Sequence, residues 1–223
     1  PPAASGSATL TYTIPAAGSC PSLSDQLVVT INPKPTVSVA PLTPAICSGL
    51  SVSLTASSTI ASSTFSWSPA SGLSSNSGAN VTGSPTATIT YTVTGTAPIT
   101  GCSNTANVIV TVNPNPTVTI PTPSAICAGS STTLTATGAG GLGPYSYSWS
   151  PSTGLSSTTL ATVTANPSTT TTYTVTVTDS RGCTGTNTVT VTVNAIPIVN
   201  AGNDLSICNG SGANTLTGYS PTT

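Results

Sequence analysis

The chain lacks almost all charge. Only five of its 223 residues carry a formal charge, 2% of the chain, where an ordinary soluble domain has about 25%. It also contains no His, no Glu and no Met. The usual general acids and bases, the common metal-ligand sets and a basic nucleic-acid footprint are therefore missing. These absences predict that the chain is not an enzyme and has no cofactor, no bound metal and no nucleic-acid partner.

Long apolar runs are missing as well. No segment approaches the roughly 18 consecutive apolar residues of a membrane helix. Residues 1–30 lack the basic start, the apolar run and the cleavage site of a signal peptide. We therefore expect no membrane span in this segment, and we expect any export signal to lie outside it.

Threonine and serine dominate what is present, with 47 and 35 residues. Gly and Pro contribute 20 residues each, and aromatic residues only 4%. The 36% of hydrophobic residues and the positive mean hydropathy argue against a disordered chain. β-branched residues favour strands, and Gly, Pro and Ser favour turns. The composition therefore predicts a folded, all-β protein.

An internal repeat organises the chain. The segment Ile-Asn-Pro-Lys-Pro-Thr-Val at residues 31–37 recurs as Val-Asn-Pro-Asn-Pro-Thr-Val at 112–118 and, with changes, at 193–199. The period of 81 residues is too long for a solenoid repeat and suits a small β-sandwich. The cysteines follow the same period to within one residue. One series contains Cys47, Cys127 and Cys208, and the other contains Cys20, Cys102 and Cys183.

The repeat predicts tandem β-sandwich domains. Residues 35–115 and 116–196 correspond to complete domains, residues 1–34 to the C-terminal part of a domain, and residues 197–223 to the N-terminal part of a further one. Either the chain is a window of a longer array, or its two ends complete each other between neighbouring subunits. The proline-containing joints restrict the backbone, so we expect the domains to lie end to end in a rod.

Alternation of apolar and polar residues locates the strands. In residues 172–178, Tyr173, Val175 and Val177 fall on one face and threonines on the other. No apolar pattern of helical period is long enough to predict a helix. Further strands are expected at residues 11–14, 27–31, 36–39, 51–56, 65–68, 80–82, 90–94, 107–112 and 188–193.

The cysteine spacing predicts one disulfide in each complete domain. Cys47 and Cys102 lie 55 residues apart, Cys127 and Cys183 lie 56 apart, and no Cys-x-x-Cys motif or His accompanies them. We therefore expect the disulfides Cys47–Cys102 and Cys127–Cys183, with buried free thiols as the alternative. Each bond would contribute about 4 kcal/mol in the chain-entropy model. Such bonds persist outside the cytoplasm.

Two cysteines have no partner in their own domain fragment. Cys20 lies in the N-terminal fragment and Cys208 in the C-terminal one. We expect each to pair with sequence that is missing from this segment, or the two to pair with each other across a subunit boundary.

Few other residues suggest a site. Trp67 and Trp149 fit either a carbohydrate platform or a sandwich core, and the core is favoured because a Trp between two cysteines on a central strand usually packs there. Asp179 and Arg181 indicate a turn with a local ion pair rather than a catalytic dyad. Asp204 alone is poor evidence for calcium, which takes about six to eight oxygen ligands.

The many outward threonines allow three interpretations. They fit O-glycosylation, an ice-binding face or simple β-propensity, and the last explains them most directly. Asn80 and Asn209 begin N-glycosylation sequons. Glycans are therefore further candidate partners.

The second complete repeat carries a resemblance to a known family. Its segments Ile-Cys-Ala-Gly at 126–129, Tyr-Ser-Trp-Ser-Pro at 147–151 and Pro-Ser-Thr-Thr-Thr-Thr-Tyr at 167–173 are similar to PKD-like and immunoglobulin-like repeats. Such repeats occur in large Bacteroidota cell-surface proteins and gliding-motility-type adhesins that use the type IX secretion route. The segment at 199–208 resembles the opening of the PKD-like variety. The resemblance implies tandem immunoglobulin-like (PKD-like) β-sandwich domains with an extracellular, non-catalytic role.

These expectations describe a structural segment of an extracellular filament or of a long cell-surface adhesin stalk. Its partners would be copies of itself or flanking repeats of the same long chain. The near absence of charge favours assembly, because neutral chains lack the repulsion that keeps proteins apart. The alternative is a carbohydrate- or surface-binding adhesive module.

Overall fold

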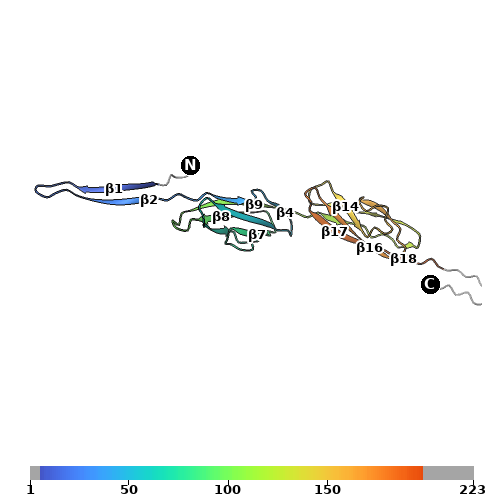
Figure 1. The fold of residues 1–223 in the computed structure, drawn as a ribbon. Helices are drawn as coiled ribbons and strands as arrows, with labels where there is room; N and C mark the ends of the chain where they lie inside the picture. Colours follow the sequence, from blue (N-terminus) through green and yellow to red (C-terminus); the bar gives the residue numbers. More distant parts are fainter. Residues whose placement is uncertain (1–5, 198–223) are drawn as a thin grey trace, which may run out of the picture. The chain divides into compact units, whose positions relative to one another are not determined.

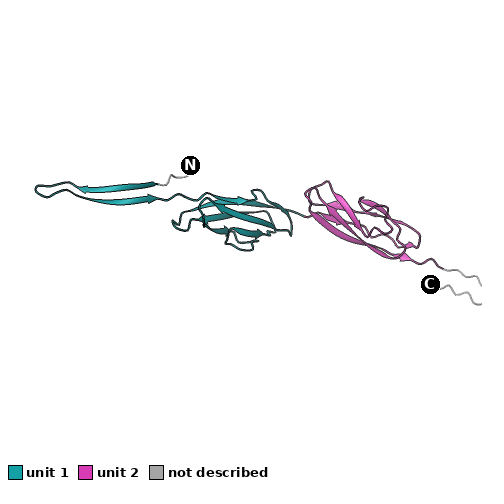
Figure 2. Ribbon diagram, in the orientation of Figure 1, with its two compact units in different colours: residues 1–114 teal, residues 115–223 magenta. Residues whose placement is uncertain are grey.

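The structure is a computed structural model and describes residues 6–197. The chain forms two compact units, residues 1–114 and residues 115–223 (Figure 2). Every regular element in the described part is a β-strand (Figure 1), which confirms the all-β prediction. Residues 6–197 offer no helix of the length and apolarity that a membrane crossing requires. The predicted four-part division of the chain stays a prediction.

Unit 1 begins with an antiparallel hairpin. Its strands are β1 (Gly6–Ile14) and β2 (Leu23–Ile31), and Leu10 pairs with Leu27 in its middle. Every residue of both strands is exposed. The hairpin therefore has no layer packed on either face.

The rest of unit 1 is a two-layered β-sandwich (Figure 1). One layer contains three strands in the order β3, β5, β7, and the other contains four in the order β4, β9, β8, β6. Neighbours are antiparallel except β4 and β9, which run parallel. The strands are β3 (Val37–Ala40), β4 (Ala45–Cys47), β5 (Val52–Ser58), β6 (Thr64–Ser68), β7 (Asn80–Gly83), β8 (Ile89–Thr96) and β9 (Ser103–Asn113).

The core of unit 1 follows the alternation of its strands. In β8, Tyr91 and Val93 are buried while the threonines beside them are exposed or only partly buried, because successive side chains in a strand point to opposite faces. Leu54 of β5 and Val110 of β9 belong to the same core, one from each layer. Each such burial stabilises the fold by about 1.5–3 kcal/mol. The layers are therefore held together by apolar side chains.

Unit 2 repeats this sandwich. The strand β14 pairs with β16, and β16 pairs with β17, in one antiparallel sheet. There are three further pairs: β10 with β13 and β12 with β15 are antiparallel, and β11 with β18 is parallel. The strands are β10 (Thr117–Thr119), β11 (Ile126–Cys127), β12 (Thr132–Thr135), β13 (Thr137–Ala139), β14 (Ser146–Ser150), β15 (Thr162–Ala165), β16 (Thr171–Thr178), β17 (Thr184–Val191) and β18 (Val193–Asn194).

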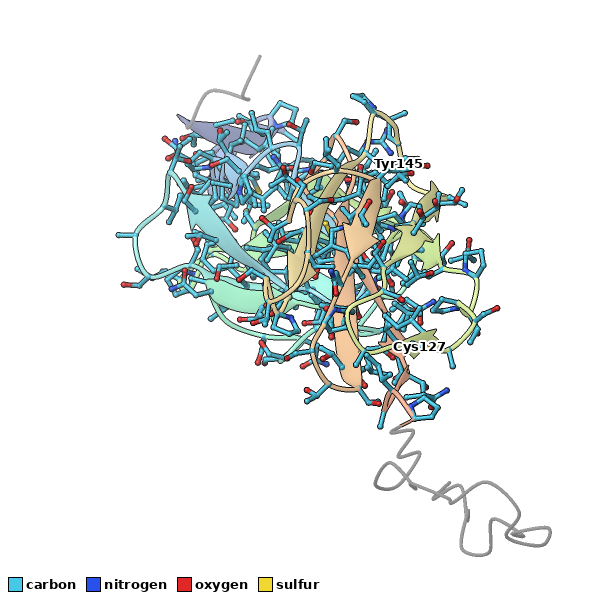
Figure 3. The ribbon with its side chains drawn as sticks, turned by 90° about the vertical axis from the view of Figure 1, so that its right-hand side faces the viewer. Cys127 and Tyr145 are labelled. Carbon is cyan, nitrogen blue, oxygen red and sulfur yellow. The ribbon has the colours of Figure 1, made fainter. Side chains whose placement is uncertain are left out.

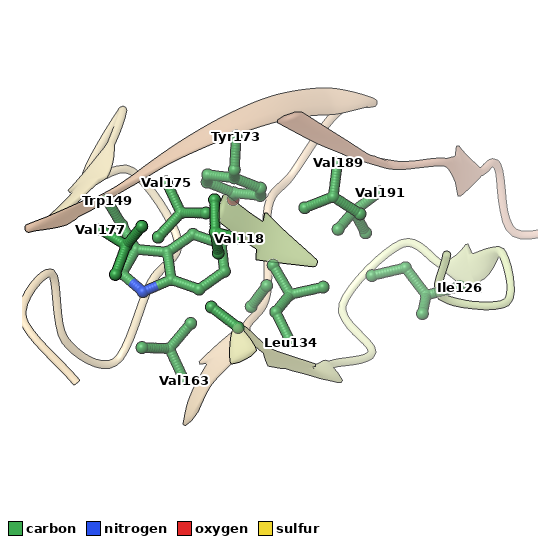
Figure 4. Packing of buried hydrophobic residues seen from close by; sticks show 12 residues of the cluster. Val118, Ile126, Leu134, Trp149, Val163, Tyr173, Val175, Val177, Val189 and Val191 are labelled. Carbon is green, nitrogen blue, oxygen red and sulfur yellow. The ribbon is translucent and has the colours of Figure 1, made fainter. Parts of the chain in front are cut away.

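The core of unit 2 confirms the alternation predicted for residues 172–178. Tyr173, Val175 and Val177 are fully buried, and the intervening threonines face outward. Tyr173, Val175 and Val177 pack against Leu134 and Trp149 (Figure 4). This cluster consists of residues of unit 2 alone.

Two short strands have no counterpart among the predicted ones, nor among the positions that these predict one 81-residue period later. They are β4 and β11, each of which pairs in parallel with the end of the chain segment that leaves its sandwich: Cys47 lies opposite Asn113, and Cys127 lies opposite Asn194. Strands of two or three residues are too short to show an alternating pattern. Their direction decides where the cysteines lie.

Candidate functional site

The described residues contain no cluster of metal-ligating side chains. Among residues 6–197 no group of three or more His, Cys, Asp or Glu side chains lies close enough to hold a metal ion. Every buried side-chain nitrogen or oxygen in this part has a hydrogen-bond partner. Asp204 lies outside the described residues. The features that remain to be examined are Asp179, the aromatic residues, one surface depression and the cysteines.

Asp179 is the one charged residue buried in the described part, and it organises a turn. Its carboxylate accepts hydrogen bonds from the backbone N–H groups of Leu142 at 3.1 Å, Arg181 at 2.9 Å and Cys183 at 2.8 Å. The Asp179–Arg181 turn predicted from the sequence is therefore present, with the backbone of Arg181 as the donor. The two oxygens tie the β16–β17 turn to the loop that precedes β14.

The pKa of Asp179 reflects this environment. Loss of solvent around the carboxyl by itself raises the pKa, but the three backbone hydrogen bonds and the nearby Arg181 charge outweigh it, so the pKa lies below its ordinary value. The carboxylate therefore stays ionised at neutral pH. This is the chemistry of a structural turn and not of a general base, which needs a pKa near 7.

The two tryptophans are core residues, as predicted. Trp67 and Trp149 are 4% and 3% exposed. The indole Nε1 of Trp67 donates to the carbonyl oxygen of Gly78 at 2.9 Å, and that of Trp149 donates to Leu160 at 2.8 Å. Since both ring faces are covered, neither is a platform for a sugar.

Two tyrosines repeat the same pattern. The hydroxyl of Tyr91 donates to the carbonyl oxygen of Ser71 at 2.7 Å, and that of Tyr173 donates to Thr153 at 2.8 Å. Burial raises the pKa of both phenols. Both residues therefore hold a loop against the core.

One apolar depression opens on unit 1. It has a volume of about 330 Å³ and is lined almost entirely by apolar atoms. Ile99 on its rim is 95% exposed. It has no convergent polar groups of the kind that orient a small ligand. Its lining residues are Pro33, Ile60, Ala61, Ala97, Pro98, Ile99 and Thr100.

The cysteines of unit 1 differ from the prediction. Cys102 has a free thiol, so the predicted Cys47–Cys102 bond is not formed, whereas Cys47 is disulfide-bonded. The cause is geometric. Cys102 directly precedes β9, and Cys47 lies opposite Asn113, the last of the 11 residues of that strand. At about 3.3 Å per residue the two cysteines are roughly 30 Å apart, whereas a disulfide needs Cα atoms within about 7 Å.

The cysteines of unit 2 also differ from the prediction. Cys127 has a free thiol and lies at the periphery of the unit (Figure 3), whereas Cys183 is disulfide-bonded. Cys183 directly precedes β17, and Cys127 lies opposite Asn194 in β18. These positions are again roughly 30 Å apart along the strand direction. The predicted Cys127–Cys183 bond is therefore wrong.

The remaining two cysteines belong to the chain ends. Cys20 is exposed and has a free thiol in the turn between β1 and β2. Cys208 lies outside the described residues. Whether these two pair with missing sequence or across a subunit boundary stays a prediction.

Comparisons with known proteins point to one fold. No family model matches the chain, and no curated protein matches it. Among solved structures, the N-terminal eight immunoglobulin domains of Down Syndrome Cell Adhesion Molecule match 86% of this chain with a TM-score of 0.50 and 14% identity. This chain covers 28% of that one. Both units are immunoglobulin-like β-sandwiches.

Two further matches are more distant. A C-terminal 282-residue fragment of intimin, solved with the intimin-binding domain of the translocated intimin receptor, matches 73% of this chain at 16% identity and a TM-score of 0.45. An I-band fragment of titin matches 73% at 12% identity and a TM-score of 0.38. The chain spans 65% and 66% of these two structures.

Proposed function

We propose that this chain is a non-catalytic structural segment of an extracellular filament or of a long cell-surface adhesin stalk. The observation that supports it is the repetition of one self-contained sandwich along the chain, with an apolar core in each unit and no polar cluster in residues 6–197 that could do chemistry. The matched cell adhesion molecule also has immunoglobulin domains in tandem. Disulfide bonds at Cys47 and Cys183 favour a location outside the cytoplasm.

The repeat type supports a finer assignment. We assign residues 35–115 and 116–196 to PKD-like domains of a large Bacteroidota surface protein of the type IX secretion kind, on the residues quoted above. Its partners are then flanking repeats of the same chain or further copies of it. Glycans at exposed Thr or Asn side chains would cover a surface that has almost no charge.

The hairpin supports the extension of the array. Tyr12 and Leu27 correspond to Val93 and Val108 at the repeat period, and these counterparts are buried under a second layer. In the hairpin both residues are more than 60% exposed. We therefore assign residues 6–31 to the last two strands of a third sandwich whose other strands come from outside the described residues.

Electron microscopy of the native material tests the structural role. We expect elongated particles with a repeating density, and compact single particles would contradict the proposal. A glycan array probed with the purified chain tests the alternative, a carbohydrate- or surface-binding module. Specific, saturable binding to one glycan class would favour that alternative over a purely structural role.

A further inference from the structure

Each sandwich carries one cysteine at each of its two ends. We call the end at which the chain enters a sandwich its entry pole and the end at which the chain leaves it its exit pole. In unit 1, Cys102 lies at the entry pole, where its Sγ is 3.9 Å from the carbonyl oxygen of Asn32. Cys47 lies at the exit pole, opposite Asn113.

Unit 2 has the same arrangement. Cys183 lies at the entry pole, two residues before Gly185, where a Cβ would meet the carbonyl oxygen of Pro116. Cys127 lies at the exit pole, opposite Asn194. The entry-pole and exit-pole cysteines of one sandwich are therefore separated by the length of its last strand.

The oxidation states show that both kinds of position form disulfides. Cys47 at an exit pole and Cys183 at an entry pole are disulfide-bonded. Their repeat counterparts, Cys127 and Cys102, have free thiols. Cys127 is exposed and Cys102 is partly exposed, so both thiols are accessible to a partner. A partner in the same sandwich is excluded, because the opposite pole is roughly 30 Å away.

We propose that Cys102 and Cys127 are crosslinking positions between repeats. Cys127 bonds the entry-pole cysteine of a repeat that follows Asn194, and Cys102 bonds the exit-pole cysteine of a repeat that precedes Asn32. A joint of about three residues reaches at most about 10 Å. It therefore keeps the entry-pole cysteine of the next repeat close to the exit-pole cysteine of the one before.

The bond forms by oxidation of two thiols. The two sulfurs lose two protons and two electrons and form one S–S bond. A small-molecule disulfide takes up the two electrons by thiol–disulfide exchange and leaves as two thiols. The result is an array in which Cys102 and Cys127 each form a covalent crosslink to a neighbouring repeat, in addition to the main-chain connection.

An extended chain tests this assignment. Residues 1–196 are joined to a second copy of residues 116–196 in which the copied cysteine is replaced, Cys127→Ser, so that the chain has a single Cys127 peptide. The copied Cys183 then lies at the entry pole of the appended repeat, at the joint that follows Asn194. The chain is refolded with glutathione disulfide, labelled with a maleimide and mapped by peptide mass spectrometry. We expect labelling of Cys127 to fall by about tenfold or more, with a linked peptide that joins it to the copied cysteine. Cys102 in the same molecule stays labelled and is the internal control.

A matched variant makes the test decisive. Replacing the copied Cys183→Ser restores labelling of Cys127 if the proposal is right, while circular dichroism shows that the appended repeat is folded. The proposal is overturned if Cys127 remains labelled in the folded, oxidised extended chain. It is also overturned if the bond of Cys127 forms only between separate molecules and disappears on dilution.

Discussion

Asp179 shows how a single carboxylate stabilises a loop in a nearly uncharged protein. Its pKa lies below the unfolded value of about 3.9, so the ionised form stabilises unit 2 above that pH. This contribution is lost as the pH falls through the lower, folded pKa. We therefore expect the acid stability of unit 2 to depend on this residue.

The variant Asp179→Asn tests this dependence. We expect a lower Tm of unit 2 at pH 7 and a smaller further drop in Tm between about pH 4 and pH 2 than in the unchanged protein. Thermal melts followed by near-ultraviolet circular dichroism at both pH values measure it. Asp25→Asn, in the exposed hairpin, is the control and should change neither value. An equal acid-induced drop in Asp179→Asn and the unchanged chain would refute the assignment.

The tyrosine hydroxyls make a second prediction. Tyr91→Phe removes the bond to the carbonyl oxygen of Ser71 and leaves that oxygen without its partner, so we expect the free energy of unfolding of unit 1 to fall by about 1 kcal/mol. Guanidinium denaturation gives this value. Tyr12→Phe, at a tyrosine that is 73% exposed, should leave it unchanged. Equal effects of the two substitutions would show that the buried hydroxyl contributes nothing.

The strands of the hairpin and of the sandwich have similar sequences and different surroundings. Leu27 in β2 corresponds to Val108 in β9 at the 81-residue period. Leu27 is 63% exposed, and Val108 is 2% exposed beneath the opposite layer. The same strand pattern therefore stabilises the fold only where a second layer covers it.

A pair of alanine variants measures this difference. We expect Val108→Ala to lower the free energy of unfolding by about 2 kcal/mol, because it removes buried methyl groups and leaves a cavity. Leu27→Ala should change it by less than about 0.5 kcal/mol in this chain. Chemical denaturation of the two variants side by side provides the comparison. A large loss in Leu27→Ala would mean that the hairpin face is covered in solution.

The two units have separate cores, and this predicts separate folding. The cluster of unit 2 contains only residues between Val118 and Val193. We expect a fragment of residues 115–197 to unfold in one cooperative transition in the presence of a reducing agent, with the near-ultraviolet signal of Trp149 intact. The matching fragment of unit 1, residues 32–114, is the comparison. A fragment of residues 115–197 without a cooperative transition would show that its core is not sufficient.

Much of this molecule follows from local pattern. The period of 81 residues, the alternation in β8 and β16, and the burial of Trp67 and Trp149 are all predictable from the sequence, because each depends on which side of a strand a residue occupies. Asp179 is visible as a turn residue, but its three backbone donors come partly from Leu142, which is 37 residues distant in the chain.

The positions of the cysteines depend on tertiary structure alone. The sequence places Cys47 and Cys102 in turns next to strands, and this is compatible with their lying at the same end of the sandwich. The short strand β4 runs parallel to β9 and carries the chain to the far end, so the two thiols are separated by the length of β9. Alternation reports the face on which a residue lies, whereas the end of the sandwich that it reaches depends on how many strands the chain has crossed, and short strands leave no trace in the pattern.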